Sequence, residues 1–591
     1  MCLAAIESRR EGPRGRRFDN GSAQMTTKTD PIDTAVAAVR AGADGWVRTP
    51  LSQRRDLLTK INALTAAHAE EWVRTAATIK GLAADSLLLG EEWMSGPYSV
   101  LTATAALAET VGALAEGRSP VDGFTIVDAP GNRSAVKVLP HGIFDALLLN
   151  GFTAEVWTTP GVDASQVRAK AGLAQRDPTT SNGVGAVLGA GNIFSIAPLD
   201  VLYQLFAYNR TVVLKLNPIT DALLPVLEKI FAPAIAQGWV AIVTGGADVG
   251  KALVEHPDIT AIHMTGSEIT HDAIVFGTGE EGARRKAANE PLIDKPITSE
   301  LGGISPTIVV PGTWSDADLK FQARHVATQR LHNNGYNCVA AQVVVISADW
   351  DQKSAFLAEL RAAFADAPAR PDYYPGSAAR VAAAKQAYPQ AESFGRNGDR
   401  TLVPGVRVGA DEHALHTEYF APVLGVIELP GTGTEFLRTA VRTANEEFHG
   451  TLGVNILVHP KTIRALGGGL DEAIAELRYG TIAVNAWTAV GYLTATASWG
   501  AFPGHTLDDV QSGIGVVHNA LLIDNPERTV IRGPFRPAPR AIFNGEFTLS
   551  PVPPWFVTNR TAPTTGRRLT EFAAAPGWGK LPALFASALR G

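Results

Sequence analysis

Four short apolar runs that alternate with helical segments constrain the fold more than any other feature of this chain. The runs occupy residues 184–188, 211–216, 239–243 and 259–264, and the segments between them carry apolar residues at helical spacing. Strands that are apolar on both faces are typical of a parallel sheet covered by helices on both sides. The pattern therefore predicts a doubly wound α/β domain over this part of the chain.

Other stretches of the chain follow different patterns. Residues 33–111 show helical spacing, and residues 123–165 contain short strands separated by Pro-Gly and His-Gly turns. A second α/β stretch runs from about residue 304 to 485. Residues 525–591 hold ten prolines, and we expect this segment to wrap the surface without forming a core of its own. Residues 1–30 are rich in arginine but have no apolar segment, so we predict a disordered arm and no secretory signal.

Length and composition bound the possible functions. A chain of 591 residues is too long for one hydrophobic core, so we expect two or three domains. The net charge of −6 argues against a nucleic-acid surface. Two cysteines cannot build a disulfide framework, which favours a reducing compartment such as the cytoplasm. The apolar runs fall short of the roughly 18–20 residues that a membrane helix needs, so no membrane partner is expected. Met25 offers a second start, so translation of residues 1–24 is left open.

One of the two cysteines stands in a sequence that suits a loop. Cys338 follows Asn334 and Gly335, and Glu300 precedes the pair Gly302-Gly303. A thiol nucleophile and a carboxylate base are what covalent catalysis on a carbonyl requires. A free cysteine alone is more often a small buried hydrophobe, so the interpretation depends on what accompanies it.

Seven segments in order resemble the aldehyde dehydrogenase superfamily, and together they cover about residues 35–520. No single segment is specific to this family, but the order and spacing of the seven segments are. They are Ala190-Gly191-Asn192, Val213-Leu214-Lys215-Leu216-Asn217-Pro218, Met264-Thr265-Gly266-Ser267, Glu300-Leu301-Gly302-Gly303, Asn334-Gly335-Tyr336-Asn337-Cys338, Glu418-Tyr419-Phe420-Ala421-Pro422 and Ser512-Gly513-Ile514-Gly515.

The resemblance implies three catalytic residues. Cys338 is the implied nucleophile, whose thiohemiacetal with an aldehyde expels a hydride and leaves a thioester. Glu300 is the implied base that activates the thiol or the hydrolytic water. Asn192 is the implied oxyanion donor, together with the backbone N–H of Cys338. The family usually has Pro and an aromatic residue before this asparagine, where this chain has Ala190 and Gly191.

The resemblance also implies an NAD or NADP site. The position three residues after Lys215 usually carries a carboxylate that favours the unphosphorylated ribose, and here it is Pro218, so both cofactors stay open. Glu418 would bind the nicotinamide ribose, with Phe420 near the ring. The cofactor residues implied by the resemblance are Lys215, Asn217, Gly266, Ser267, Leu301, Glu418 and Phe420. The histidine spacing suggests no metal site.

The fold implied by the resemblance is α/β: two doubly wound parallel-sheet domains and a small β oligomerisation arm, in a homodimer or homotetramer. We assign 31–122 and 166–299 to a dinucleotide-binding domain, 123–165 to the arm, 300–490 to a catalytic domain, 491–524 to a return segment and 525–591 to an extension. The expected activity is oxidation of an aldehyde to a carboxylic acid. A CoA-acylating dehydrogenase and a non-catalytic dinucleotide-binding scaffold are the alternatives.

Overall fold

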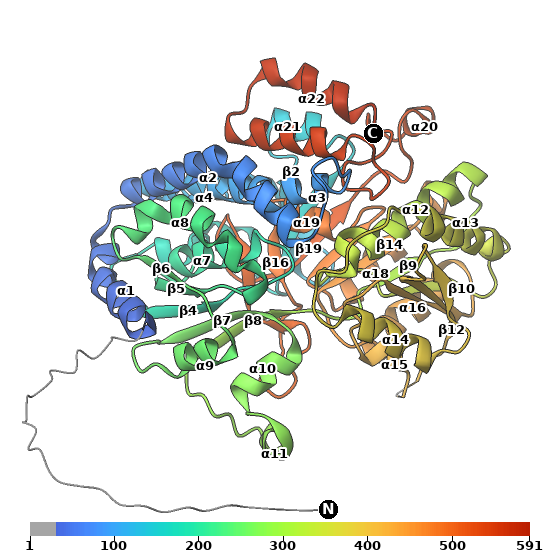
Figure 1. The fold of residues 1–591 in the computed structure, drawn as a ribbon. Coiled ribbons are helices and arrows are strands. Elements are labelled where there is room, and N and C mark those ends of the chain that lie inside the picture. The colour runs from blue at the N-terminus through green and yellow to red at the C-terminus, as the bar shows by residue number, and fades with distance from the viewer. Residues whose placement is uncertain (1–30, 410) are drawn as a thin grey trace, which may run out of the picture.

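The structure is a computed structural model that describes residues 31–409 and 411–591. The arm predicted at residues 1–30, with Cys2, lies outside the described residues. Figure 1 shows two bodies side by side, each built on a sheet, with the C-terminal helices α21 (Ala562–Ala574) and α22 (Leu581–Ala588) packed above them. The α/β architecture with parallel sheets expected from the sequence is confirmed.

The first body contains a six-stranded sheet. All neighbouring strands are parallel except the outer β17, which pairs antiparallel with β8. The four apolar runs predicted as strands are β4 to β7, which form three of the four inner strands and one edge of this sheet. In sheet order the strands are β17 (Gly513–Ile514), β8 (Ile297–Leu301), β7 (Ala261–Gly266), β4 (Val184–Leu188), β5 (Thr211–Lys215) and β6 (Val240–Val243).

Helices cover this sheet, and the largest apolar cluster between them joins α2, α4, α7 and α8 to β5. The helices of this body are α1 (Pro31–Arg48), α2 (Leu51–Ile79), α3 (Leu89–Trp93), α4 (Ser99–Ala115), α7 (Ile196–Phe206), α8 (Leu224–Ile235), α9 (Ala247–Glu255), α10 (Glu268–Val275) and α11 (Gly279–Ala288).

The second body contains an eleven-stranded sheet whose central strands, from β19 to β12, are parallel. In order its strands are β1 (Ile126–Ala129), β2 (Arg133–Leu139), β3 (Thr153–Thr158), β19 (Pro526–Arg532), β15 (Thr481–Val484), β14 (Gly453–Leu457), β9 (Pro306–Val309), β10 (Val343–Ser347), β13 (Val423–Leu429), β12 (Arg400–Val406) and β11 (Glu392–Phe394).

Its helices are α12 (Asp316–Leu331), α13 (Lys353–Asp366), α14 (Ser377–Ala387), α15 (His413–His416), α16 (Gly433–Glu447), α17 (Pro460–Leu466) and α18 (Gly469–Glu476). The helix α19 (Ala489–Leu493) and the short ribbon of β16 (Ser498–Gly500) and β18 (Val516–Asn519) lie between β15 and β19 in the sequence.

The strands predicted for the arm, β1 to β3, belong to the sheet of their own chain. Strand β3 pairs antiparallel with β19, and β19 pairs in parallel with β15. Two helices that the sequence did not predict accompany these strands, α5 (Ile143–Leu148) and α6 (Ala164–Lys170). The assembly of subunits through this arm stays a prediction.

The C-terminal segment differs from what its proline content suggested. Its first residues form β19 inside the large sheet, where Arg528 is only 1% exposed and donates to the carbonyls of Ile474 and Leu477. The remainder contains α20 (Arg540–Phe543), α21 and α22. Residues of α21 and α22 form a small apolar cluster with α5, so this segment does build a local core. We use "C-terminal extension" below for residues 533–591.

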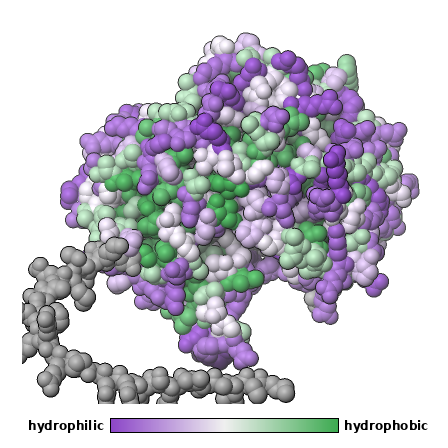
Figure 2. All heavy atoms as spheres, in the orientation of Figure 1, coloured by the Kyte–Doolittle hydropathy of each residue, from purple (hydrophilic) through white to green (hydrophobic). Residues whose placement is uncertain are grey.

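One helical stretch, Leu89–Ala115, is long and apolar enough to cross a membrane, contrary to the expectation from the sequence. Much of α4, which forms most of it, is buried against α2 and the first sheet, and a core helix has the same composition. Figure 2 shows a surface on which hydrophilic and hydrophobic residues are interspersed.

Candidate active site

Cys338 follows a sharply turned, buried loop at the end of α12. Asn333, Asn334 and Gly335 have φ angles of +50°, +55° and +78°, a left-handed conformation that Asn and Gly adopt at least cost. This turn directs the chain back towards β10. The Cys338 side chain is only partly exposed and borders an apolar cavity of about 50 Å³. The expected loop is therefore present, although it lies inside the molecule.

Glu300 approaches Cys338 from the other sheet. It lies in strand β8, opposite Thr265 of β7, and its side chain is fully buried. Neither carboxylate oxygen has a hydrogen-bond partner within the described residues. Burial raises the pKa of Glu300, and its interactions with Cys338 and Trp499 lower that pKa only in part. A buried carboxylate with a raised pKa and free lone pairs is suited to accept a proton.

The thiol responds to the same environment. Burial raises the pKa of Cys338 well above its ordinary value, and the charge of Glu300 and its contact with the thiol raise it further. At neutral pH the thiol is therefore protonated, and Glu300 is a carboxylate that interacts with it. The structure brings the two predicted catalytic residues together although 37 residues separate them in the sequence.

Asn192 lies in the buried turn between β4 and α7, and it is tied to the loop that carries the cysteine. Its Nδ2 donates to the carbonyl of Tyr336 at 2.9 Å, and its own carbonyl accepts from Asn333 at 3.2 Å and from the Tyr373 hydroxyl at 3.1 Å. One amide hydrogen is thereby committed to holding the Cys338 loop. The role of Asn192 as an oxyanion donor stays a prediction.

Lys215 and Asn217 stand together at the carboxyl end of β5. Burial lowers the pKa of Lys215, while the charges of Asp221 and Asp248 oppose that shift. Among residues 31–409 and 411–591 its ammonium makes no hydrogen bond or ion pair. Asn217 accepts from the N–H of Ile219 at 3.1 Å. A free cation at the carboxyl end of a parallel strand is where dinucleotides bind in doubly wound folds.

Gly191 explains part of this geometry. A Cβ atom at this position would lie 2.7 Å from the Asn217 side chain, so a larger residue would displace it. The usual aromatic residue of the family would not fit before Asn192 in this chain, because Asn217 at the end of β5 occupies that space.

Gly266, Ser267 and Leu301 end the next two strands. Ser267 caps α10 by accepting from the N–H of Thr270 at 3.3 Å, and both Gly266 and Ser267 are exposed. Leu301 is 1% exposed and packs in an apolar cluster with Met264 of β7. Leu301 is thus a core residue beneath the strand ends, and its contact with a cofactor stays a prediction.

Glu418 and Phe420 come from the second body, in the segment before β13. Burial raises the pKa of Glu418 to about 7, although the charge of Arg330 and the N–H of Gly303 favour the carboxylate. A side chain at Gly302 would overlap the Glu418 carboxyl group, which accounts for the glycine there. The ring of Phe420 packs on Tyr374, with centroids 4.9 Å apart.

A buried group of polar side chains behind Glu300 was not found from the sequence. Asp200 of α7 accepts from His518 at 3.1 Å and from the Thr265 hydroxyl at 3.2 Å, and pairs with His263 at 3.4 Å. Burial opposes ionisation of Asp200, but contact with the two histidines lowers its pKa overall. Its members lie on α7, β7 and β18, so no local motif could have revealed this group.

Trp499 and Tyr492 complete the surroundings of Cys338. Trp499 lies opposite His518 in the β16–β18 ribbon, and its ring packs on Tyr492 at 5.4 Å. Tyr492 shares a hydrogen bond of 2.7 Å with Ser195. Both aromatic residues border the Cys338 cavity.

The sequence model of the aldehyde dehydrogenase family matches residues 154–500. The chain belongs to the aldehyde dehydrogenase family. A putative aldehyde dehydrogenase of Staphylococcus aureus is 26% identical over 296 residues, which are 46% of this chain and 58% of that protein. The 3,6-anhydro-alpha-L-galactose dehydrogenase of Streptomyces coelicolor is 24% identical over 331 residues, 55% of this chain and 52% of that protein. The match thus spans little more than half the length of these relatives.

The fold is similar to that of solved aldehyde dehydrogenases. An NAD-dependent aldehyde dehydrogenase from Sinorhizobium meliloti superposes with a TM-score of 0.57 at 20% identity, covering 86% of this chain and 88% of that structure. Among the described residues of this family member, no group of three or more His, Cys, Asp or Glu side chains is arranged to hold a metal ion.

Proposed function

We propose that this protein is an NAD- or NADP-dependent aldehyde dehydrogenase that oxidises an aldehyde to a carboxylic acid through a thioester on Cys338. The observation that carries the proposal is that Cys338 borders an apolar cavity and interacts with the buried carboxylate of Glu300. A protonated thiol beside a carboxylate that has free lone pairs is an arrangement for nucleophilic attack on a carbonyl.

The residues act in two steps. Glu300 accepts the thiol proton as the sulfur attacks the aldehyde carbon, and the carbonyl oxygen becomes the thiohemiacetal oxyanion. A bound nicotinamide would accept the hydride that leaves this carbon, so that the aldehyde is oxidised to a thioester. Glu300 releases the thiol proton to solvent and then takes a proton from the water whose oxygen attacks the thioester. It passes this proton to the leaving sulfur, so that the carboxylic acid leaves as the thiol is restored.

The residues around the strand ends fit a dinucleotide. The Lys215 ammonium has no partner in the described part of the chain and suits ribose hydroxyl groups. The Glu418 carboxyl, which lies against Gly302, suits the second ribose. Pro218 presents no carboxylate that would repel a 2′-phosphate, so the proposal includes both NAD and NADP.

We also propose a cytoplasmic homodimer or homotetramer. A reducing compartment suits a free catalytic thiol. Because β1 to β3 pair with their own chain, subunits would meet through the outer edge of β1 or by exchanging the arm. Light scattering on the purified protein measures the assembly directly.

The test is NAD(P)H production at 340 nm from a panel of aliphatic, aromatic and semialdehyde substrates. Each substrate is assayed with NAD and with NADP, beside the Cys338→Ala variant. Turnover that is lost in the variant is the expected result. Turnover that requires added CoA would replace this proposal with the acylating reaction. Dinucleotide binding without turnover under either condition would favour a non-catalytic scaffold.

A further inference from the structure

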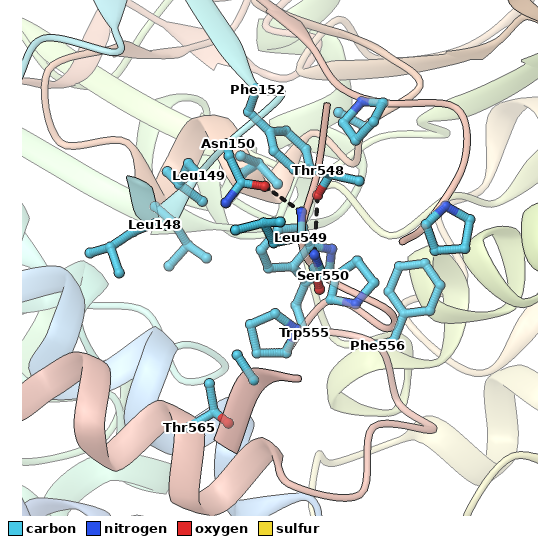
Figure 3. Close-up of a pocket in the computed structure, with 18 of the residues that line it drawn as sticks. Leu148, Leu149, Asn150, Phe152, Thr548, Leu549, Ser550, Trp555, Phe556 and Thr565 are labelled. Atoms are coloured by element: carbon cyan, nitrogen blue, oxygen red, sulfur yellow. Dashed lines mark hydrogen bonds between the residues drawn. The ribbon is translucent and has the colours of Figure 1, made fainter. Parts of the chain in front are cut away.

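The C-terminal extension lines one side of an apolar cavity of about 110 Å³ that the proposed mechanism does not use. We call it the extension cavity. Figure 3 shows side chains from the extension and from the segment between β2 and β3 facing one another across it. Its volume is of the order of the ~150 Å³ cavity that accepts benzene in an engineered protein core. Its apolar walls include Leu148, Leu149, Phe152, Leu549, Trp555 and Phe556.

The polar groups around this cavity are neutral or already satisfied. Asn150 accepts from the N–H of Leu549 at 2.6 Å and donates to the Leu147 carbonyl at 2.7 Å. Arg536 is paired with Asp318 and Glu546. Such walls offer an anionic or cationic headgroup little compensation for losing water, which favours an apolar occupant.

His325, which also borders the cavity, supports the same conclusion. Burial lowers its pKa to about 3, so the imidazole is neutral at physiological pH. Its ring stacks on Phe556, with centroids 5.3 Å apart. The imidazole therefore contributes an aromatic surface and no charge.

The extension cavity adjoins the cavity at Cys338. Met94, Leu493 and Trp555 border both cavities, so these three side chains form the partition between them. Met94 is an unbranched, flexible side chain that can change its rotamer to let the hydrocarbon tail of a bound molecule pass. A molecule whose reactive carbon sits at Cys338 has the extension cavity as the next apolar space beyond the partition.

We propose that the extension cavity holds the tail of the aldehyde, and that the substrates are aldehydes with an extended hydrocarbon tail. This inference rests on the proposed aldehyde dehydrogenase function. Trp555 gives the extension a direct part in the active site, because the same residue borders the space around the nucleophile. Each methylene buried beyond the partition should raise kcat/KM by about three- to fourfold until the cavity is full.

The experiment compares propanal, hexanal and decanal with wild-type protein and the Leu549→Trp variant, which fills the cavity from its wall. The control is Ile542→Trp, which places the same side chain on the exposed face of α20 in the same extension. Wild type and control should prefer decanal over propanal by at least tenfold. Leu549→Trp should lose that preference while propanal kinetics stay unchanged. Equal kcat/KM for the three aldehydes in wild type, or an equal loss for all three in Leu549→Trp, overturns the inference.

A second variant keeps the test informative if the Leu549→Trp protein misfolds. Leu589→Trp narrows the cavity at a residue that borders it but is 54% exposed, so the added ring has room in solvent. It should reduce decanal turnover more than propanal turnover. An equal effect on both substrates, in a protein with unchanged circular dichroism, contradicts the proposed cavity.

A binding measurement separates failure of this inference from failure of the proposed function. If no protein oxidises any aldehyde, isothermal titration calorimetry with 1-octanol reports on the cavity alone. Saturable binding to wild type and Ile542→Trp, and its loss in Leu549→Trp, supports an apolar tail site independently of the reaction. Absence of 1-octanol binding to wild type refutes it.

Discussion

The half-buried carboxyl of Glu418 makes a pH-dependent contribution to stability that can be measured without any substrate. Its pKa is raised from an ordinary 4.5 to about 7, chiefly by burial. Between these values the folded protein holds a proton that the unfolded chain has released, so stability falls as the pH rises through this window. From 4.5 to about 7, at ~1.4 kcal/mol for each pKa unit, the full penalty above pH 7 is about 3 kcal/mol.

Replacing Glu418 with Gln keeps the shape of the side chain and removes the titration. We expect Glu418→Gln to increase the free energy of unfolding by up to about 3 kcal/mol at pH 8 and by little at pH 5. The measurement is urea unfolding of the cofactor-free protein at both pH values, followed by tryptophan fluorescence. Glu435→Gln, at an exposed position on α16, is the matched control and should show no such pH dependence.

Gly302→Ala provides an independent check of the same reasoning. The added methyl group would overlap the Glu418 carboxyl and push it towards water, which should reduce the pH dependence of stability. In a Glu418→Gln background the Gly302→Ala change should add no further pH dependence. A stabilisation by Glu418→Gln that is the same at pH 5 and pH 8 would refute the assignment of a half-buried, proton-holding carboxyl.

Two further predictions concern groups that the sequence did not reveal. The interaction with His518 lowers the pKa of Glu300, so His518→Asn should shift the acidic limb of the kcat–pH profile to higher pH. An unchanged profile would show that His518 does not influence the pKa of Glu300. Asp318→Asn removes the more buried of the two carboxylates paired with Arg536 and should cost up to about 3–5 kcal/mol, seen as faster proteolysis of the C-terminal extension. Arg567→Gln breaks only exposed pairs, with Glu70 and Glu571, and should cost less than about 1 kcal/mol. A similar cost for Asp318→Asn and Arg567→Gln would count against this ranking.

The first sheet was predictable because its strands are buried on both faces. The strands β4 to β7 are continuous apolar runs, and such runs carry their structural signal in the local sequence. Cys338 and Glu300 were predicted as partners through the family resemblance, and in the structure each affects the pKa of the other. That interaction depends on how the two bodies pack, which local spacing does not encode.

Strand β19 shows why other elements could not be predicted. Its sequence contains Pro526, Glu527, Arg528 and Arg532, which resembles a surface segment more than an inner strand. Arg528 is buried because its guanidinium bonds to main-chain carbonyls before β15, and Glu527 pairs with Arg133 of β2. The partners that compensate the buried charges lie about 50 and 390 residues away along the chain. The local sequence of β19 therefore indicated a surface extension.

Burial raises the pKa of both Cys338 and Glu300, the proposed nucleophile and base, and the coupling between these two groups can be broken selectively. Burial and the charge of Glu300 both raise the pKa of Cys338, so the resting thiol loses its proton more readily to Glu300 than to bulk water. Glu300→Gln removes the negative charge and should lower the pKa of Cys338. Alkylation of Cys338 by iodoacetamide at pH 7.5 should therefore become severalfold faster, because the thiolate is the reactive species, while aldehyde turnover falls for want of a base. Slower alkylation in this variant would mean that Glu300 activates the thiol in the resting protein, and the coupling argued here would be wrong.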